Sequence, residues 1–529
     1  MKNKFLNAGI FMLWVLISFT ACKKDKPVPP PTSSTAPSRN DLTKDSIFLY
    51  AKEIYLWNTD LPSLTTFSPR SYNSSSDNYS NLTSELFAIT RYSINPSTNL
   101  SYEYNKDYPS ETKYSFIDDL VASGKLTFAP NAKSSVGLDG KGNDFGVALA
   151  AVGTSTNYKI YFKFTSPGSP AALAGLGRAD IIESINGKSI GTDFNNEVDF
   201  INNAFDDTKN TTVQIAGKRK DNTAYNVTLT KKSYNSSPIY KDTVLISSGK
   251  QIGYLAFARF SDDNNSSSAL DTVFAHFVKA GVTDLIIDLR YNGGGFVSTA
   301  EHLINLIAPS SANGKVMFSE AYNSTMQSGQ ATILQNQPLR DQSGKIQYSN
   351  GRMLTYADIS YTIADNTFNI NKTNGISNVG KVVFIISGST ASASELVINS
   401  LRPYVDVKTV GETSYGKPVG FFPVRIDKFD VYMSNFSSTN ASGNGDYYAG
   451  FTPDSQKPDD VTKDFGNSNE LCTAAALAYI GTGVFPSSTS NIKVEGVLSQ
   501  SGVSIRNVFT PSLFNGMIDN TPKKLKKLK

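Results

Sequence analysis

Cysteine and histidine are scarce in this chain of 529 residues, which has only two of each. Cys22 and Cys472 are too few for a cysteine-based metal site. His276 and His302 both fall within stretches that are predicted to be helical, "VFAHFVKAG" and "TAEHLINLI". The pattern therefore argues against a histidine metal cluster and favours structural or surface roles for both rings. No metal and no cofactor is expected.

The sequence also lacks a strong charge of one sign and a long hydrophobic segment. It has 50 basic and 46 acidic residues, with the basic excess in 23–26 and 523–529. Nothing elsewhere has the basic pattern of a nucleic-acid surface, so we expect no nucleic-acid partner. The last basic run is interpreted as a solvated tail. The apolar run at 5–19 is shorter than the ~20 residues that a membrane-spanning helix requires.

What the N-terminus does have is the pattern of an export signal. Two lysines precede the apolar run, and small residues follow it immediately before Cys22. The "TAC" ending at Cys22 resembles a bacterial lipobox, which implies that 1–21 is a signal peptide and that lipid on Cys22 anchors the chain to a membrane of the cell envelope. Lys23 after the cysteine favours the outer membrane by analogy. The alternative is an ordinary signal peptide in which Cys22 is incidental.

The rest of the chain is long enough for several domains. Composition and periodicity divide it into five parts. They are a Pro/Ser/Thr-rich tether at 22–40, a mostly helical N-terminal domain at 41–135, a β-rich domain at 136–232, an α/β domain at 233–485 and a C-terminal extension with a basic tail at 486–529.

The β-rich domain is expected to bind peptides. Its short strands flank the stretch 166–190, which holds a helix start, "SPAAL", and an Asn-Gly hairpin turn. This part resembles a PDZ domain, with Phe145, Gly146 and Val147 at the positions of the family's carboxylate-binding loop. Adjacent backbone N–H groups of such a loop can bind a terminal carboxylate, and the neighbouring strand edge accepts an added strand. The alternative is a purely structural β-domain.

The α/β domain places two conspicuous motifs at the ends of predicted strands. The strand 282–290 runs into the glycine loop "YNGGG", and the strand 380–388 runs into the serine cluster of "SGSTASAS". Ligands of layered α/β sheets lie beyond the carboxyl ends of strands. We therefore expect both motifs to border one site.

A serine nucleophile in a chain so poor in histidine needs another base. Lysine can serve when burial in an apolar setting lowers its pKa from about 10.4 toward neutrality. Lys417, in "GETSYGKPVGFFPV" (411–424), has Phe421 and Phe422 nearby in sequence. The ordinary alternative for a loop lysine is exposure to solvent.

Together these motifs resemble the carboxy-terminal processing (tail-specific) serine proteases. The resemblance covers about 136–460 and rests on "IDLRYNGGG", "GSTASASELVINSL" and "VGETSYGKPVG" in that order. In that family a serine of the small-residue cluster is the nucleophile and a lysine 25 residues later is the general base, a spacing that Ser392 and Lys417 satisfy. Ser389 and Ser394 give spacings of 28 and 23. The implied fold is a crotonase-like α/β layer with an inserted PDZ domain.

The resemblance also implies an oxyanion hole. Ala393 falls in the first turn of the predicted helix, where backbone N–H groups lack helical partners. A second donor is expected from Gly294 or Gly295, where the absence of side chains lets the backbone approach substrate. Glu395 is interpreted as a cap of the same helix or as an organiser of the site.

One position departs from the family pattern. Many members carry a glutamine four residues after the lysine, and this chain has Phe421 there. We therefore expect a Ser-Lys dyad without that third member, with Ser414 or Tyr415 as substitutes that could hydrogen-bond the lysine.

The sequence thus predicts an exported serine endopeptidase that cleaves unfolded or tail-exposed polypeptides, with the PDZ domain capturing the substrate's C-terminus. Two alternatives stand beside it. The first is an inactive relative that serves as a peptide-binding scaffold, which the departure at Phe421 favours. The second is a different acyl-transfer enzyme on a crotonase-like sheet.

Overall fold

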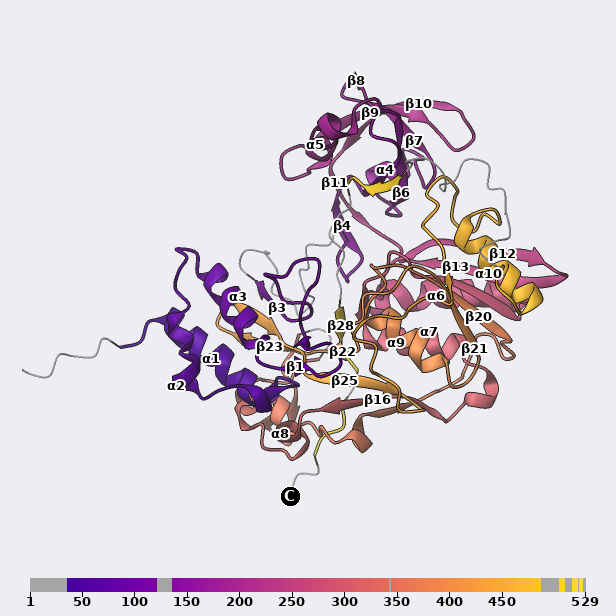
Figure 1. The fold of residues 1–529 in the computed structure, drawn as a ribbon. Coiled ribbons are helices and arrows are strands. Elements are labelled where there is room, and N and C mark those ends of the chain that lie inside the picture. The colour runs from indigo at the N-terminus through magenta and orange to yellow at the C-terminus, as the bar shows by residue number, and fades with distance from the viewer. Residues whose placement is uncertain are drawn as a thin grey trace, which may run out of the picture.

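The computed structural model describes residues 36–120, 136–341, 344–486, 504–509, 516–521 and 523–526 (Figure 1). The expected signal peptide, Cys22 and most of the expected tether lie outside these residues. Within the described ranges, no helix is both long enough and apolar enough to cross a membrane.

The N-terminal region begins with helices, as expected. Helix α1 (Arg39–Ile54) starts at Ser38, whose hydroxyl accepts a hydrogen bond from the Asp41 N–H. This bond satisfies one of the free N–H groups of the first turn. Short elements follow: α2 (Leu64–Phe67), α3 (Asn78–Ile89), β1 (Ile94–Asn95) and β2 (Leu100–Ser101).

These helices do not enclose a core of their own. Ile47 and Phe48 of α1 belong to the same buried cluster as Leu285 and Phe384 of the α/β domain. Strand β3 (Phe116–Asp119) pairs with β24 (Phe429–Tyr432), which in turn pairs with β23 (Pro423–Ile426). The part of the expected N-terminal domain that the structure describes is therefore packed into the α/β domain.

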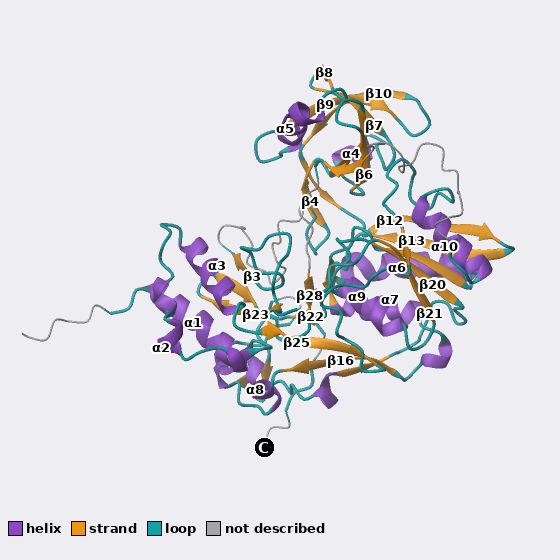
Figure 2. Ribbon diagram, viewed as in Figure 1, coloured by secondary structure: helices purple, strands orange, loops and turns teal. Residues whose placement is uncertain are grey.

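The β-rich domain, residues 141–235, stands above the rest of the molecule in the view of Figure 1 and is mostly strand (Figure 2). Its sheet has the order β10-β9-β7-β6-β5-β27, and β8 pairs with β7. Strands β4 and β11 pair with each other where the chain enters and leaves the domain. The elements are β4 (Lys141–Asp144), β5 (Val147–Gly153), β6 (Tyr158–Thr165), α4 (Pro170–Leu173), β7 (Ile181–Ile185), β8 (Lys188–Ser189), α5 (Phe194–Phe205), β9 (Thr212–Lys218), β10 (Ala224–Thr230) and β11 (Lys232–Asn235).

The last strand of that sheet comes from the far end of the chain. Strand β27 (Ser504–Asn507) pairs antiparallel with β5, and in Figure 1 it is the yellow strand among the magenta ones. The C-terminal extension is therefore in part integrated into the β-rich domain.

The α/β domain is built on a six-stranded sheet of order β12-β13-β14-β20-β21-β26. All neighbours are parallel except β12 and β13. Alternate residues of β14 face opposite cores, with Leu285 and Ile287 toward α6, α7 and α9 and Ile286 toward α10. Both faces of the parallel strands are thus buried, which explains their continuous apolar runs. The elements are β12 (Ile239–Ser247), β13 (Lys250–Phe257), α6 (Asp263–Lys279), β14 (Asp284–Asp288), α7 (Val297–Ile307), β20 (Lys381–Ile386), α9 (Ala393–Leu401), β21 (Asp406–Gly411), β26 (Ser455–Gln456) and α10 (Leu471–Thr482).

Smaller sheets lie beside the carboxyl end of this layer. One has the order β19-β16-β25-β22, and another pairs β15 with β28, again from the end of the chain. Their elements, with the short ones between them, are β15 (Gly294–Phe296), β16 (Val316–Tyr322), α8 (Ser324–Gln327), β17 (Tyr348–Ser349), β18 (Arg352–Met353), β19 (Thr367–Asn369), β22 (Val419–Gly420), β25 (Phe436–Asn440) and β28 (Gly516–Ile518).

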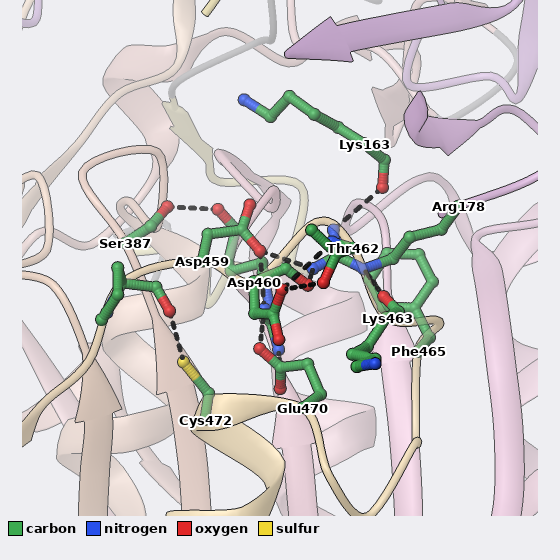
Figure 3. Close-up of polar contacts among 12 residues, drawn as sticks. Lys163, Arg178, Ser387, Asp459, Asp460, Thr462, Lys463, Phe465, Glu470 and Cys472 are labelled. Carbon is green, nitrogen blue, oxygen red and sulfur yellow. Dashed lines mark hydrogen bonds and ion pairs between the residues drawn. The ribbon is translucent and has the colours of Figure 1, made fainter. Parts of the chain in front are cut away.

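A buried ionic network joins the β-rich domain to the central sheet (Figure 3). Arg178 of the β-rich domain donates to Asp459 at 2.6 Å and to the Tyr291 hydroxyl at 2.7 Å. Arg290, at the end of β14, pairs with the same Asp459 and with Glu470. Although burial alone would raise the pKa of Asp459, the charges of Arg178 and Arg290 hold it well below its usual range. The network ties the β-rich domain to the loop that follows β14.

Candidate active site

Ser392 lies on a sharp turn between a buried strand and a helix. It is the N-cap of α9, six residues after β20 ends, and its φ of 62° is in a region that residues other than glycine seldom adopt. The surrounding structure has to hold such a conformation in place. The side chain is fully buried, and its hydroxyl has no hydrogen-bond partner within the part of the chain that is described.

Glu395 binds both this serine turn and the loop 412–418 that carries Lys417, here called the lysine loop. Its Oε2 accepts hydrogen bonds from the N–H of Ser392 and the N–H of Lys417, both at 2.8 Å. Its Oε1 accepts from the Gly416 N–H at 2.8 Å and from the Ser414 hydroxyl at 2.6 Å. Burial raises the pKa of Glu395, and these four donors oppose that shift by stabilising the charged form. The Glu395 carboxylate therefore caps the start of α9 and also binds the loop that carries Lys417, which are the two roles expected for it.

Lys417 is fully buried, in contrast to the exposed alternative. Its Nζ donates to the Tyr114 carbonyl at 3.3 Å and lies 4.3 Å from the centre of the Phe421 ring. Burial lowers its pKa to about 7, against the opposing charges of Glu103 and Glu395, and nearby Lys113 lowers it further. Such an amine loses its proton far more readily than an exposed lysine and can then accept one.

Phe421 packs against the amine in the place where the family often has glutamine. The ring is fully buried and makes edge contacts with Phe116 and Tyr432. It is part of the apolar surroundings that lower the pKa of Lys417. The two residues suggested as substitutes bond elsewhere, since Ser414 donates to Glu395 and the Tyr415 hydroxyl donates to the Lys113 carbonyl at 2.8 Å. The expectation that either would hydrogen-bond the lysine was wrong, because each hydroxyl points to a different acceptor.

Asn292 of the glycine loop binds the serine turn, a role that the sequence did not indicate. Its carbonyl accepts from the Ala391 N–H and from the Ser394 hydroxyl, so it binds the turn that carries Ser392. Its side-chain Oδ1 accepts from the Gly294 N–H at 2.9 Å. The only available signal was the asparagine itself in "YNGGG", a residue type that readily bonds nearby backbone.

The hydrogen bond from Gly294 N–H to Asn292 affects which backbone groups can form the expected oxyanion hole. The Gly294 N–H already has a partner, so it is a poor second donor, and that alternative is corrected. The Gly294 carbonyl and the Phe296 N–H both bond Phe260. Because successive strand residues point to opposite sides, the Gly295 N–H faces away from Phe260 toward β28. Ala393 is close by, since a Cβ added to Gly294 would lie 3.1 Å from the Ala393 nitrogen.

The other predicted residues lie elsewhere. His276 is next to Asp242 and His302 is next to Asp271, so each ring has an acidic neighbour away from the serine turn. In the expected carboxylate loop, Phe145 is buried in the domain core, Gly146 has a φ of 74° and Val147 begins β5. Cys22 lies outside the described residues, and Cys472 is buried in α10.

The fold joins an α/β domain, in which Ser392, Glu395 and Lys417 are buried, to a β-rich domain, and comparisons with known proteins find relatives of both parts. Residues 251–456 match the model of peptidase family S41, and residues 166–215 match that of the PDZ domain. These matches confirm the resemblance to carboxy-terminal processing proteases and to the PDZ domain.

Individual relatives are distant. A Staphylococcus aureus protein named "Probable CtpA-like serine protease" is 25% identical over 323 residues, covering 60% of this chain and 54% of its own length. The chloroplastic "C-terminal processing peptidase" of Tetradesmus obliquus is 22% identical over 273 residues, covering 50% and 49%. The match therefore spans about half the length of these curated relatives. A Bacteroides fragilis crystal structure named "Putative S41 protease" has the same fold, with a TM-score of 0.53, 21% identity and coverage of 84% of this chain and 97% of its own.

Proposed function

We propose that this protein is a serine endopeptidase in which Ser392 is the nucleophile and Lys417 is the general base. The observation that carries the proposal is the shared acceptor, Oε2 of Glu395, which binds the backbone N–H of both residues. Burial of the lysine, which lowers its pKa to about 7, supports its assignment as the general base.

In the proposed reaction, neutral Lys417 takes the hydroxyl proton of Ser392 as the oxygen attacks a peptide carbonyl. The bond from carbon to nitrogen then breaks, and the lysine returns the proton to the leaving amine. The Ala393 N–H and the Gly295 N–H are the proposed donors to the oxyanion. Removal of one such donor typically lowers the rate by about 10²–10³. Water hydrolyses the acyl-enzyme in a second cycle of the same steps.

The proposed substrates are polypeptides that are unfolded or have an exposed tail. The edge of β5 beside Gly146 is suited to binding an extended segment by main-chain hydrogen bonds. Such binding requires that the substrate have no competing structure of its own. Lipid on Cys22 would hold the enzyme at a membrane of the bacterial cell envelope, with the outer membrane favoured.

The proposal is tested with the purified chain and an unstructured fluorogenic peptide. Cleavage that is abolished in both Ser392→Ala and Lys417→Met supports the dyad. Undiminished cleavage by Ser392→Ala would refute it. Peptide binding without any hydrolysis by the unmodified chain would favour the scaffold alternative.

A further inference from the structure

The C-terminal segment occupies the edge of the PDZ sheet where a peptide ligand would add. Strand β27 runs antiparallel to β5, from the pair Ser504/Gly153 to the pair Asn507/Ala150. Hydrogen bonds continue beyond the strand, because Val508 N–H donates to the Leu149 carbonyl at 3.2 Å and Leu149 N–H donates back to the Phe509 carbonyl at 2.6 Å. This is strand addition by the chain's own residues.

The side chains of this segment fill the neighbouring hollow. Val508 and Phe509 pack against the buried cluster of the PDZ domain, and the Phe509 ring lies 5.8 Å from that of Phe205 on α5. An extended segment beside β5 with an aromatic residue against α5 is a ligand-like arrangement. Twenty residues follow Phe509, so the bound segment is internal and does not bring a terminal carboxylate to Gly146.

The same segment then reaches the catalytic site. Strand β28 lies between the glycine loop and the lysine loop, with hydrogen bonds on both edges. On one edge Gly516 N–H donates to the Gly293 carbonyl at 3.0 Å. On the other, Phe421 N–H donates to the Met517 carbonyl and Asp519 N–H donates to the Phe421 carbonyl, both at 3.1 Å.

The Gly516 carbonyl oxygen lies beside Gly294, and therefore close to the proposed oxyanion hole. A Cβ added to Gly294 would overlap the Gly516 oxygen and would also lie within 3.1 Å of the Ala393 nitrogen. That position adjoins both proposed oxyanion donors. Ile518 fills the space beside Phe421, the residue that lines the lysine amine.

Residues beyond the strand anchor the segment by charge. Lys523 donates to Glu320 at 2.6 Å and to Asp519 at 2.7 Å, with Glu320 fully buried. Burial and the charge of Asp519 raise the pKa of Glu320 to about 7, while Lys523 opposes that rise. Leu525 forms a bridge with Ile359, and Ser360 N–H donates to the Lys524 carbonyl. The described part of the basic run is therefore docked, which corrects the expectation of a solvated tail.

We propose that the described residues of 504–526, here called the tail segment, are the resident ligand of both peptide grooves, so that a substrate binds only after displacing them. The consequence of this inference, autoinhibition, rests on the proposed function. The occupation of the two grooves by the tail segment does not. Phe509 and Gly516 are seven positions apart in the chain, so their Cα atoms are at most about 25 Å apart. Release from the PDZ groove would therefore loosen the covalently linked occupant of the catalytic groove.

The experiment uses a full chain with a site-specific protease sequence inserted within 487–503, so that the tail segment is cut only after folding. The cut protein is diluted, and release of the fragment is followed by size exclusion and mass spectrometry. Cleavage of an unstructured fluorogenic peptide is measured before and after release. We expect activity to rise at least ~10-fold on release and a synthetic 504–526 peptide to restore inhibition by raising KM, as for a competitor. A chain ending at Lys526 is the control, because it keeps every described tail contact.

A second pair of variants needs no cutting. Val508→Pro removes the N–H that bonds the Leu149 carbonyl, and Val508→Ala retains it. The proline variant is expected to have a several-fold lower KM than the alanine variant. Equal KM values for the two, or unchanged activity after the fragment has left, would overturn the inference.

A binding measurement separates this inference from the proposed function. Labelled 504–526 peptide is added to the cut and emptied Ser392→Ala protein, and fluorescence anisotropy reports binding. If the peptide binds tightly but neither the intact nor the emptied protein hydrolyses the substrate, the tail segment is a groove ligand and the proposed endopeptidase activity is refuted. Hydrolysis that is indifferent to the tail segment would refute the occupancy and leave the endopeptidase intact.

Discussion

The backbone N–H groups of Ser392 and Lys417 donate to the same atom, Oε2 of Glu395, each at 2.8 Å. The two residues are 25 positions apart in the chain and belong to different loops. One carboxylate thus sets the positions of the serine turn and the lysine loop relative to each other. The side-chain chemistry proposed above depends on that placement.

Ser392→Ala is expected to lower kcat for an unstructured peptide by about 10⁴-fold or more, because the nucleophile is lost. Its folding stability should change little, since the hydroxyl makes no hydrogen bond within the described residues. Ser389→Ala, in the same cluster at a different spacing from the lysine, is the matched control and should retain activity. Steady-state kinetics and thermal unfolding of both variants provide the check. Comparable losses in both variants would argue against the assignment.

Glu395→Gln tests the positioning role. One amide oxygen cannot serve the four donors that now bond the carboxylate, and each buried donor left unpaired costs about 1–3 kcal/mol. We expect kcat to fall about 10–100-fold with KM nearly unchanged. Loss of the negative charge also lowers the pKa of Lys417, so the midpoint of the pH–rate profile should move to lower pH.

The exposed Glu412 provides the control, as Glu412→Gln. A purely structural role for Glu395 would reduce stability without moving the pH midpoint. That result would remove the link between Glu395 and the lysine.

Phe421→Gln introduces the residue that many relatives have. The amide can hydrogen-bond and hydrate the charged amine, which raises the pKa of Lys417 and shifts the pH–rate midpoint upward. Loss of a fully buried ring should also reduce stability by about 2–4 kcal/mol. Phe421→Leu, which keeps the site apolar, should leave the midpoint where it is. A midpoint that moves equally in both variants would show that the ring does not act through desolvation.

The elements around the site could largely be predicted from the sequence, because buried parallel strands and amphipathic helices have strong patterns. The strand 282–290 and the helix with Ala393 in its first turn are predicted from the sequence, and β14 and α9 are found there. Strands β27 and β28 could not be predicted. They are three or four residues long, and backbone hydrogen bonds to strands hundreds of residues away position them. No side-chain periodicity reports such pairing.

The packing of the N-terminal region into the α/β domain could not be predicted for a related reason. Helix α1 buries residues such as Ile47, Ala51 and Ile54, but their spacing in the sequence does not reveal which surface they pack against. The role of Asn292 depends on contacts to Ala391 and Ser394, which are distant in sequence. Such partners appear only once the fold brings the loops together.

Arg178→Met tests the attachment of the PDZ domain. The guanidinium is almost fully buried and pairs with Asp459, which retains Arg290 as a second partner. Breaking one buried ion pair typically costs about 3–5 kcal/mol, so calorimetry should find a lower Tm. Lys218→Met, on the exposed face of the same domain, should unfold as the unmodified chain does. An unchanged Tm for Arg178→Met would show that the network does not hold the domains together.

The titration of Lys417 bears most directly on the central claim. The unfolded chain holds the lysine proton up to about pH 10.4, and burial lowers this in the folded chain to about 7. Below that pH the amine is protonated and cannot act as a base, so kcat/KM should rise with pH through about 7. A buried lysine of this kind also makes folding stability increase between about pH 7 and 10, where the unfolded chain binds more protons.

The decisive measurement is an NMR titration of ¹³C-lysine-labelled Ser392→Ala protein, with the Lys417 resonance assigned by its absence in a further Lys417→Met variant. We predict a midpoint near pH 7 for this side chain alone. A midpoint near 10.4, as for an exposed lysine, would contradict the proposed dyad.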